Sequence, residues 1–409
     1  MGNRRLPVLC DSSVCTGCAS CSNICPKDAI RMTAGNDGFL RPIVDTERCV
    51  RCLACENACP VLHPAECSSN RTEPLVFACW NKDAKARSES SSGGAFSALA
   101  TAIFAAGGYV TGAVYDDDMN VRHQLCCSID DLTRLRGSKY VQSEIGTVYG
   151  EIKEKLVAGN TVLFVGTPCQ VAGIRAYLKN EYENLYCCDF ICHGTPSPLL
   201  FKNYIRWVES VRRIKISQFN FRHKRSGWYD AVRVANGNYY MKGKLDAYFF
   251  GFNHDISLRE SCYRCPSIGL PRKGDITIAD YWGIGMKYRF EKLNEIPNGI
   301  SLVMLNNEKG EKLFEKAKIF LHFKQGDFGE ALNRNQPMIK PSHRPQSRDT
   351  FYLDMNTLSF EELRRKYLHV KGKAWLVAWF RENAPRKCVT CLRAIIQLIT
   401  WKYNGSKTL

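Results

Sequence analysis

A cysteine pattern that occurs twice near the start of the chain places the strongest constraint on its fold. Cys15, Cys18, Cys21 and Cys25 are followed by Pro26, and Cys49, Cys52, Cys55 and Cys59 are followed by Pro60. Each cysteine therefore recurs 34 positions later, which indicates a duplicated unit. The shared pattern, C-x2-C-x2-C-x3-C-P, is typical of bacterial segments that bind [4Fe-4S] clusters.

The spacing also predicts which cysteines share a cluster. Three cysteines at intervals of three wrap one cluster, and the fourth reaches the other cluster. Cluster one would take Cys15, Cys18, Cys21 and Cys59, and cluster two would take Cys49, Cys52, Cys55 and Cys25. A short hairpin is expected between the repeats, and residues 8–62 resemble a two-cluster bacterial ferredoxin. The alternative is a pair of zinc sites, although zinc usually takes two C-x2-C pairs.

The number of cysteines, 21 in 409 residues, also bears on the compartment. The first ten residues contain no apolar segment of the kind that a secretory signal needs, so we expect a cytoplasmic protein. Cysteines in a reducing cytosol are more often metal ligands than disulfide partners. The uncharged stretch 91–115 is interrupted by glycines, and we expect a helix, a turn and a strand there rather than a membrane span.

The length suggests more than one domain, and the composition changes along the chain. We expect a ferredoxin domain at 1–66, a polar linker at 67–74, a large domain at 75–345 and a helical basic region at 346–409. The large domain divides into parts 75–160 and 161–345, in which predicted strands and helices alternate. This alternation favours a mixed α/β domain, so the whole chain is expected to be a multidomain α+β or α/β protein.

Four further cysteines stand at the ends of predicted elements or in loops. Cys169, Cys192, Cys262 and Cys265 form a four-thiolate set that suits zinc or a third cluster. Cys187 and Cys188 compete as ligands, but as neighbours on a strand they point to opposite faces. The Gly-rich segment 90–96 precedes a predicted helix, where backbone N–H groups can hold a phosphate, or where the glycines serve tight packing alone.

Several motifs of the large domain, taken in order, resemble the coenzyme F420 hydrogenase/dehydrogenase beta-subunit family over residues 75–305. They are Ser92-Gly93-Gly94, Gly137-Ser138-Lys139-Tyr140, Gly166-Thr167-Pro168-Cys169-Gln170, Cys192-His193-Gly194, Cys262-x2-Cys265 and Asp280-Tyr281-Trp282-Gly283. The resemblance implies a flavin-binding domain that holds FAD and a [4Fe-4S] cluster. It assigns the third cluster to Cys169, Cys192, Cys262 and Cys265, and FAD to Ser92, Gly93, Gly94, Ser138, Lys139 and Tyr140.

These cofactors imply an iron–sulfur flavoprotein oxidoreductase. A ferredoxin or another redox partner protein would supply electrons, and an unidentified small molecule or cofactor would accept them. Lys139 and His193 are the candidate catalytic residues: Lys139 would neutralise anionic charge, and His193 would donate a proton or bond to the cluster. A structural role is the alternative for both. An electron-transfer adaptor without its own substrate chemistry is the alternative for the whole chain.

One segment bears on the choice of substrate. Residues 336–351 look like members of the family found alongside bacterial polysaccharide-synthesis enzymes. That likeness suggests a link to polysaccharide biosynthesis and weakens the transfer of coenzyme F420 itself as the substrate.

The net charge of +17 is unevenly distributed. Residues 1–74 hold eight basic and eight acidic residues, whereas residues 363–409 hold eleven basic residues and one acid. Because the cysteine-rich part is neutral, zinc modules that bind nucleic acid are not expected. The tail contains short apolar, Trp-bearing runs at 374–380 and 394–401. These indicate either an interfacial helix at the inner face of the membrane or a helical hairpin docked on the protein.

Overall fold

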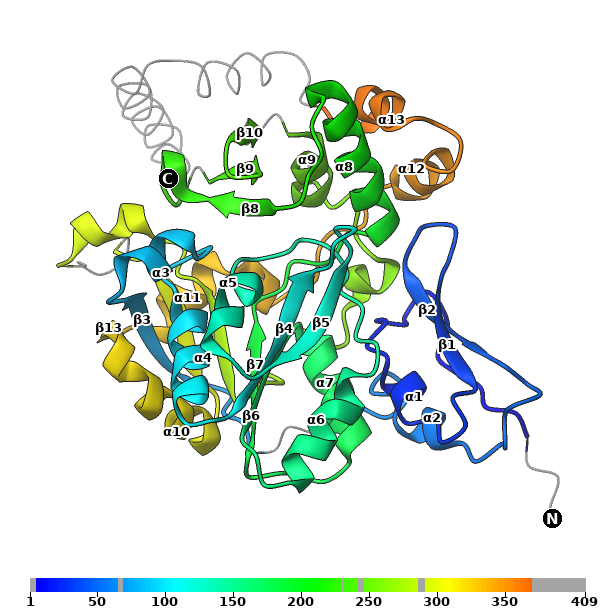
Figure 1. The fold of residues 1–409 in the computed structure, drawn as a ribbon, viewed down its shortest axis with the longest axis horizontal. Coiled ribbons are helices and arrows are strands. Elements are labelled where there is room, and N and C mark those ends of the chain that lie inside the picture. Colours follow the sequence, from blue (N-terminus) through cyan, green and yellow to red (C-terminus); the bar gives the residue numbers. More distant parts are fainter. Residues whose placement is uncertain (1–4, 65–68, 230, 242–245, 286–290, 370–409) are drawn as a thin grey trace, which may run out of the picture.

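The computed structural model describes residues 5–64, 69–229, 231–241, 246–285 and 291–369. These residues form a small front module, a large central sheet covered by helices, and a cap of helices and short strands (Figure 1). The basic tail beyond residue 369 lies outside the described residues, so the two predictions for it stay predictions. No described helix has the length and apolar character that a bilayer crossing needs.

The front module repeats its backbone as well as its sequence. It contains α1 (Ser20–Asn23), β1 (Ile30–Ala34), β2 (Leu40–Val44) and α2 (Ala54–Asn57). Each one-turn helix follows a residue in the left-handed region, Ala19 before α1 and Leu53 before α2, both with φ of 61°. β1 and β2 pair antiparallel, with Ile30 opposite Val44, which confirms the expected hairpin.

The central sheet has eight strands in the order β13-β3-β12-β11-β7-β6-β4-β5. Their bounds are β3 (Leu75–Asn81), β4 (Tyr109–Tyr115), β5 (Val121–Cys126), β6 (Val162–Gly166), β7 (Leu185–Phe190), β11 (Ile276–Asp280), β12 (Ser301–Leu305) and β13 (Leu321–Gln325). β4, β6, β7 and β11 are parallel neighbours, and the remaining pairs are antiparallel. The expected mixed α/β architecture is therefore confirmed.

Helices cover both faces of this sheet (Figure 1). They are α3 (Ala84–Glu89), α4 (Ala95–Ala105), α5 (Leu132–Leu135), α6 (Val148–Val157), α7 (Pro168–Leu178), α10 (Glu308–Ala317) and α11 (Phe328–Arg334). Successive residues of a strand serve opposite faces: Leu163 packs in the core beneath α4 and α10, whereas Val162 and Phe164 pack beneath α6 and α7. The interior strands are therefore apolar on both faces, as strands buried between helical layers must be.

One expected helix begins later than the sequence suggests. We expect a helix over 144–158, but α6 starts at Val148. Glu144 instead extends the sheet edge, because its N–H donates to the Val121 carbonyl and its carbonyl accepts from the His123 N–H. The edge strand β5 has unpaired backbone groups, which bond to the segment around Glu144. Helix propensity alone does not predict this competing pairing with the sheet.

The cap has a core of its own, which the expected domain boundaries do not anticipate. Its elements are α8 (Pro198–Arg212), β8 (Phe219–His223), β9 (Val232–Ala235), β10 (Tyr239–Met241), α9 (Ala247–Asn253), α12 (Arg348–Asp354) and α13 (Phe360–Tyr367). Phe351 and Phe360 pack in one cluster with Tyr204 and Tyr248. The expected boundary at 345/346 therefore does not coincide with a structural break, and the one at 160/161 falls inside the central sheet.

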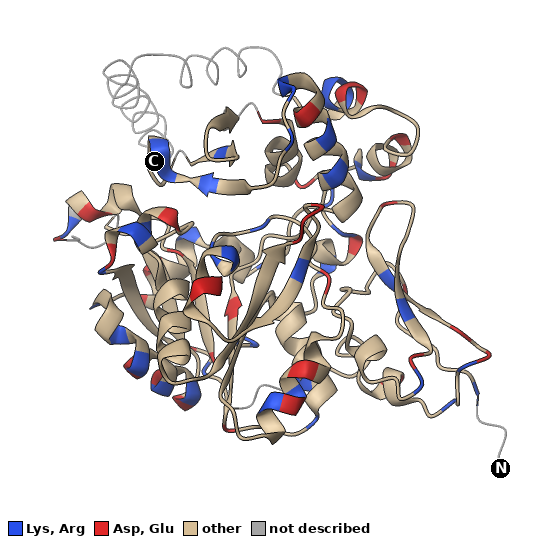
Figure 2. Ribbon diagram, viewed as in Figure 1, with Lys and Arg blue, Asp and Glu red and all other residues tan. Residues whose placement is uncertain are grey.

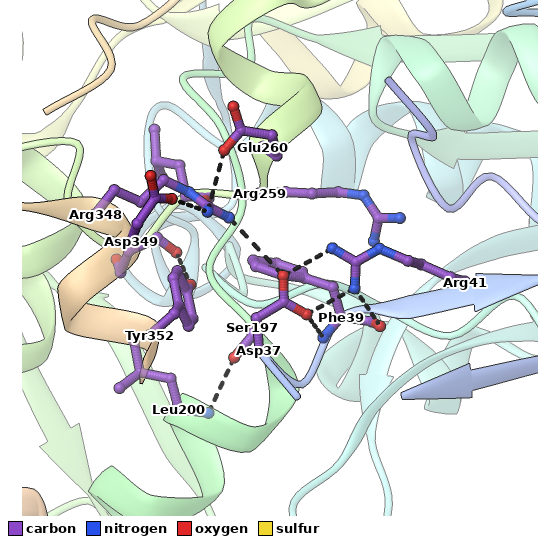
Figure 3. Close-up of polar contacts among 12 residues, drawn as sticks. Asp37, Phe39, Arg41, Ser197, Leu200, Arg259, Glu260, Arg348, Asp349 and Tyr352 are labelled. Atoms are coloured by element: carbon purple, nitrogen blue, oxygen red, sulfur yellow. Dashed lines mark hydrogen bonds and ion pairs between the residues drawn. The ribbon is translucent and has the colours of Figure 1, made fainter. Parts of the chain in front are cut away.

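The front module inserts its hairpin turn into the cap (Figure 3). Phe39 is fully buried in the cap core, where its ring lies 5.7 Å from that of Tyr352. Beside it, Asp37 pairs with Arg41 at 2.6 Å and lies 3.9 Å from Arg348 of α12. A buried aromatic anchor inside a rim of ion pairs is typical of a stable interface.

A second contact joins the front module to α7. A Cβ built on Gly173 would lie 2.8 Å from the Cys18 Cβ and 2.9 Å from the Tyr149 Oη. Only a residue without a side chain allows the Cys18 loop to approach this helix so closely.

We expect Gly173→Ala to destabilise the protein by about 1–3 kcal/mol, because the added methyl overpacks a buried contact. Gly150→Ala in α6 is the matched control, since its Cβ would meet only the Tyr177 Oη, at 3.8 Å. That control should be neutral or stabilising by up to about 1 kcal/mol, as expected of Gly→Ala inside a helix. Anaerobic denaturant unfolding with iron analysis measures both effects, and equal stabilities would contradict the close-packing argument.

Candidate functional site

The twelve predicted cysteine ligands form three predicted groups, which we name the first, second and third thiol sets. The first thiol set comprises Cys15, Cys18, Cys21 and Cys59, the second comprises Cys25, Cys49, Cys52 and Cys55, and the third comprises Cys169, Cys192, Cys262 and Cys265. These are the groups that spacing and resemblance predict. Every cysteine that the structure describes is a free thiol.

In the first thiol set, one further cysteine lies against the predicted ligands. The Cys10 side chain lies within hydrogen-bonding reach of Cys15 and Cys59, and this contact lowers the pKa of each of these two thiols to about 6. Burial, followed by repulsion from Cys18, Cys15 and Cys59, raises the pKa of Cys21. The four thiols therefore lie within electrostatic reach of one another. The sequence offered no signal for Cys10 other than its position ahead of the repeat.

The second thiol set encloses a small cavity that all four of its cysteines line. Cys52 is exposed at the surface of the module, whereas Cys55 is buried. Burial and repulsion from Cys25 and Cys52 raise the pKa of Cys55, although the Glu56 N–H opposes them. The second thiol set is therefore the one nearest to solvent.

The third thiol set lies where parallel strands end. Cys169 follows β6 at the start of α7, and Cys192 follows β7. Cys262 and Cys265 come from the 3-10 turn Glu260–Arg264 and the residue after it. Burial raises the pKa of Cys262 to about 12, repulsion from Cys265 and Cys169 adds to the rise, and the Thr195 N–H opposes it. The Thr167 hydroxyl lies 3.1 Å from the Cys169 sulfur.

The first and third thiol sets face each other across the contact with α7. Burial raises the pKa of Cys18 to about 12, and Cys169 contributes to this rise together with Cys15 and Cys59. Cys18 is therefore close enough to Cys169, a cysteine of the large domain, for their charges to interact. The two modules thus meet through their predicted ligands.

The described residues contain no three His, Cys, Asp or Glu side chains at the spacing that a single metal ion requires. A tetrahedral zinc site would hold its sulfurs about 4 Å apart, since each Zn–S bond is about 2.3 Å. A four-iron cluster is held by thiolates at its separate corners, so its ligands stand around a wider space.

A cavity of about 570 Å³ adjoins the third thiol set, and all four of its cysteines line the wall. Five of the six predicted FAD residues line the same cavity: Ser92, Gly94, Ser138, Lys139 and Tyr140. The backbone N–H of Ser138 donates to the Ser91 hydroxyl at 2.8 Å, which ties the two predicted FAD segments together. Gly93 packs against the sheet instead, since a Cβ there would collide with the Cys79 carbonyl oxygen.

Lys139 stabilises a turn at the wall of this cavity. Its Nζ donates to the carbonyl oxygens of Arg134, Leu135, Arg136 and Gly137 at 2.9–3.3 Å. Burial, with the charge of Arg134, lowers the pKa of Lys139 to about 7. The geometry gives Lys139 a structural role, and it also places an ionisable amine beside the cavity.

His193 follows Cys192 and also lines the cavity. Its Nε2 lies 2.7 Å from the Asp255 Oδ1, and its ring meets Phe252 edge-on at 5.0 Å. Its carbonyl accepts from the Ser342 hydroxyl at 2.6 Å. Ser342 belongs to the segment 336–351 that the sequence singled out, so this segment forms part of the cavity wall.

A buried polar and aromatic group at the end of β11 was not among the predicted site residues. Asp280 accepts from the Trp228 indole N–H at 2.6 Å and pairs with Arg222 at 3.1 Å. Trp228 stacks on Trp282 with ring centroids 4.8 Å apart and planes inclined by 8°. Asp280 and Trp282 belong to the DYWG motif, which was the only sequence signal for this group.

His123 on β5 is a second cavity residue that the sequence did not indicate. Burial lowers the pKa of His123 to about 4, and its Nε2 bonds to the Val165 carbonyl at 3.1 Å. Because a carbonyl can only accept, Nε2 carries the proton and Nδ1 is left as an acceptor. A neutral imidazole therefore stands beside the cavity at neutral pH.

Two family models match the chain. Residues 159–327 match the model for the C terminus of the coenzyme F420 hydrogenase/dehydrogenase beta subunit, and residues 14–62 match that for the 4Fe-4S dicluster domain. The predicted resemblance is therefore confirmed over these residues. Together, the matches indicate an oxidoreductase-type electron-transfer protein with iron–sulfur clusters in its front module.

Comparison of the chain with individual proteins gives less information on its function than the family models do. No curated protein matches the chain. A solved chain from the xenon-derivatised F420-reducing [NiFe] hydrogenase complex of Methanosarcina barkeri is similar, with a TM-score of 0.46 and 14% identity. The similarity covers 66% of this chain and 93% of that one.

We expect Cys52→Ser to remove the spectroscopic signal of one front cluster and to leave the other in place, because the second thiol set has its own cavity. Cys127→Ser is the matched control, since Cys127 is also exposed but belongs to no thiol set. Anaerobic electron paramagnetic resonance of the reduced proteins measures the outcome. Two unchanged front-cluster signals in Cys52→Ser would refute the second ligand set.

We also expect His123 to make stability depend on pH. The unfolded chain takes up a proton near pH 6.5, whereas the folded protein does so only near pH 4. The stability that neutral His123 contributes is therefore fully present above pH 6.5, and it is lost as the pH falls towards 4. Between pH 7 and 5 the loss is about 2 kcal/mol.

His123→Gln should remove this part of the pH dependence, and denaturant unfolding at both pH values measures it. The exposed His254 supplies the control variant, His254→Gln. A pH dependence in His123→Gln equal to that of the unmodified protein would contradict the assignment.

Proposed function

We propose that the protein is an iron–sulfur flavoprotein oxidoreductase. Its front module receives electrons from a ferredoxin or another redox partner protein, and its large domain delivers them, with FAD, to a small-molecule acceptor. The observation that carries the proposal is the single cavity lined on one side by the third thiol set and on another by the predicted FAD residues. Clusters handle single electrons, whereas a flavin can hold two and release a hydride equivalent.

The residues around the cavity suit a cluster and a flavin side by side. The four cysteines of the third thiol set supply a complete set of thiolates. The eleven-residue helix α4 begins at the cavity after Gly94, whose φ is 90°, and the N–H of its first residue, Ala95, donates to the Ser301 hydroxyl at 3.4 Å. Such a helix start attracts phosphate oxygens.

Unpaired polar atoms provide further support for a ligand in the cavity. Among the described residues, the Nε atoms of Arg222 and Arg272 and the Nε2 of Gln142 are buried without a hydrogen-bond partner. All three residues line the cavity. Buried donors without partners are costly, so a group that accepts hydrogen bonds fits here.

In this proposal several residues of the cavity wall have defined tasks. Arg222 holds positive charge at the wall where an anionic flavin or substrate would lie, and such an anion would favour the protonated form of Lys139. The Trp282–Trp228 stack, held by Asp280, provides a rigid apolar surface that orients a planar ring. His193, whose Nε2 lies 2.7 Å from the Asp255 Oδ1, would donate a proton beside the third thiol set. The segment 336–351 closes one side of the cavity, and the suggested link to polysaccharide biosynthesis rests on its sequence alone.

Cofactor analysis of the anaerobically purified protein tests the proposal. Three clusters predict about twelve iron atoms and twelve sulfides per chain, together with one FAD. Cys262→Ser should lose the third cluster and retain the two front clusters. Cys188→Ser is the control, since Cys188 is buried in the sheet core and belongs to no thiol set.

Each departure from this result has a definite meaning. A protein with clusters and no flavin would support the electron-transfer adaptor and overturn the flavoenzyme. Zinc without sulfide would overturn the clusters altogether. Unchanged iron content in Cys262→Ser would show that the third thiol set holds no cluster.

A further inference from the structure

Arg259 occupies an unusual place in this structure, between the first and third thiol sets. Its backbone stands three residues before Cys262, and its carbonyl accepts from the Cys262 N–H at 2.9 Å. Its own N–H donates to the Thr195 carbonyl at 2.9 Å, in the loop that also carries Cys192. The backbone of Arg259 is thus part of the frame of the third thiol set.

The side chain of Arg259 reaches in the opposite direction, into the front module. Its Nε donates to the Cys15 carbonyl at 2.7 Å, and its Nη2 donates to the Leu40 carbonyl at 3.0 Å. A Cβ on Gly17 would lie 3.0 Å from its Nη1, so the guanidinium packs against the loop that joins Cys15 to Cys18. One residue therefore spans both sets.

This guanidinium is buried without a carboxylate partner. Arg259 is 1% exposed, and the ion pairs of the described residues give it no Asp or Glu within 4.0 Å. Figure 3 shows that the nearby Asp37 is engaged by Arg41 and Arg348 instead. A buried cation needs countercharge, and the thiolate sets on either side are the groups that can supply it.

The guanidinium also lies beside the third thiol set. Its Nη1 donates to the Gln142 Oε1 at 3.2 Å, and Arg259 lines the cavity that all four cysteines of that set line. The side chain of Arg259 is therefore placed next to both sets.

We propose that Arg259 is a positioning residue that couples the front module electrically to the large domain, by stabilising the reduced forms of the clusters held by the first and third thiol sets. This inference rests on the proposed function. Reduction adds one electron to a cluster, so a buried cation beside it favours the reduced form and raises its reduction potential. The second thiol set has no such contact with Arg259, so its potential is independent of this residue.

Redox titration of the anaerobic full-length protein, followed by electron paramagnetic resonance, tests the inference. Arg259→Met keeps much of the side-chain volume and removes the charge. It should lower the equilibrium constant for reduction of the first and third clusters about tenfold, which is about 59 mV for one electron. The second cluster should keep its potential, and Arg259→Lys should restore most of the shift because it retains the charge.

Arg87→Met is the matched control, since Arg87 is also buried but pairs with Glu295 at 2.5 Å and takes no part in a thiol set. It should leave all cluster potentials unchanged, even if it costs stability. If Arg259→Met proves unstable, the cluster reduction potentials of Arg259→Lys are compared with those of Arg87→Lys instead. Lysine retains the positive charge but lacks the several N–H donors of the planar guanidinium. That shift should be smaller than tenfold and confined to the first and third clusters.

The outcomes separate this inference from the function on which it rests. Three clusters with potentials that do not move in Arg259→Met would overturn the role of Arg259 and leave the proposed function intact. A protein without a third cluster would overturn the proposed function, while the shift at the first cluster would still show whether Arg259 acts. Equal shifts at all three clusters would also overturn the inference, because they indicate a general change in structure.

Discussion

The close approach of the Cys18 loop to α7 is the contact on which the organisation of the molecule depends. It requires a glycine at position 173, and it brings Cys18 within electrostatic reach of Cys169. The hairpin turn fixes the other end of the front module by burying Phe39 in the cap. With two separated attachment points, the module cannot rotate without breaking buried contacts. A rigid attachment is what transfer of electrons between the modules would require.

The position of the large cavity follows from the sheet. β6, β7 and β11 run parallel and end on the same edge, where open α/β sheets usually bind their ligands. Cys169, Cys192 and Trp282 come from the segments that follow these three strands. The front module lines part of the cavity through Thr16 and Gly17, and Gly17 packs against Gln142 and Arg259 of the large domain. The third thiol set, the predicted FAD residues and the contact with the front module therefore all lie at this edge of the sheet.

Local patterns accounted for much of this arrangement, and long-range contacts for the rest. The repeat of cysteines predicted the first and second thiol sets, because ligand spacing within a short loop is a local property. The strand position of Cys187 and Cys188 predicted that they face opposite sides, as the separate cores beneath them show. The cap was not anticipated, since α12 joins α8 across more than a hundred residues of sequence. Arg259 was missed for the same reason, because its contact with Cys15 spans 244 positions.

Charge is unevenly placed among the described residues. The front module carries both signs, as Figure 2 shows, whereas the charged residues that line the cavity are Arg and Lys except for Asp280. Arg272, another buried cation at the third thiol set, is balanced by Asp189 at 3.3 Å. Arg259 lacks such a carboxylate among the described residues, and its nearest anions would be the thiolate sets themselves. A buried guanidinium that depends on the thiolate sets for its countercharge links the stability of this interface to their charge state. The docking of the two modules and the reduction of their clusters are therefore expected to be coupled.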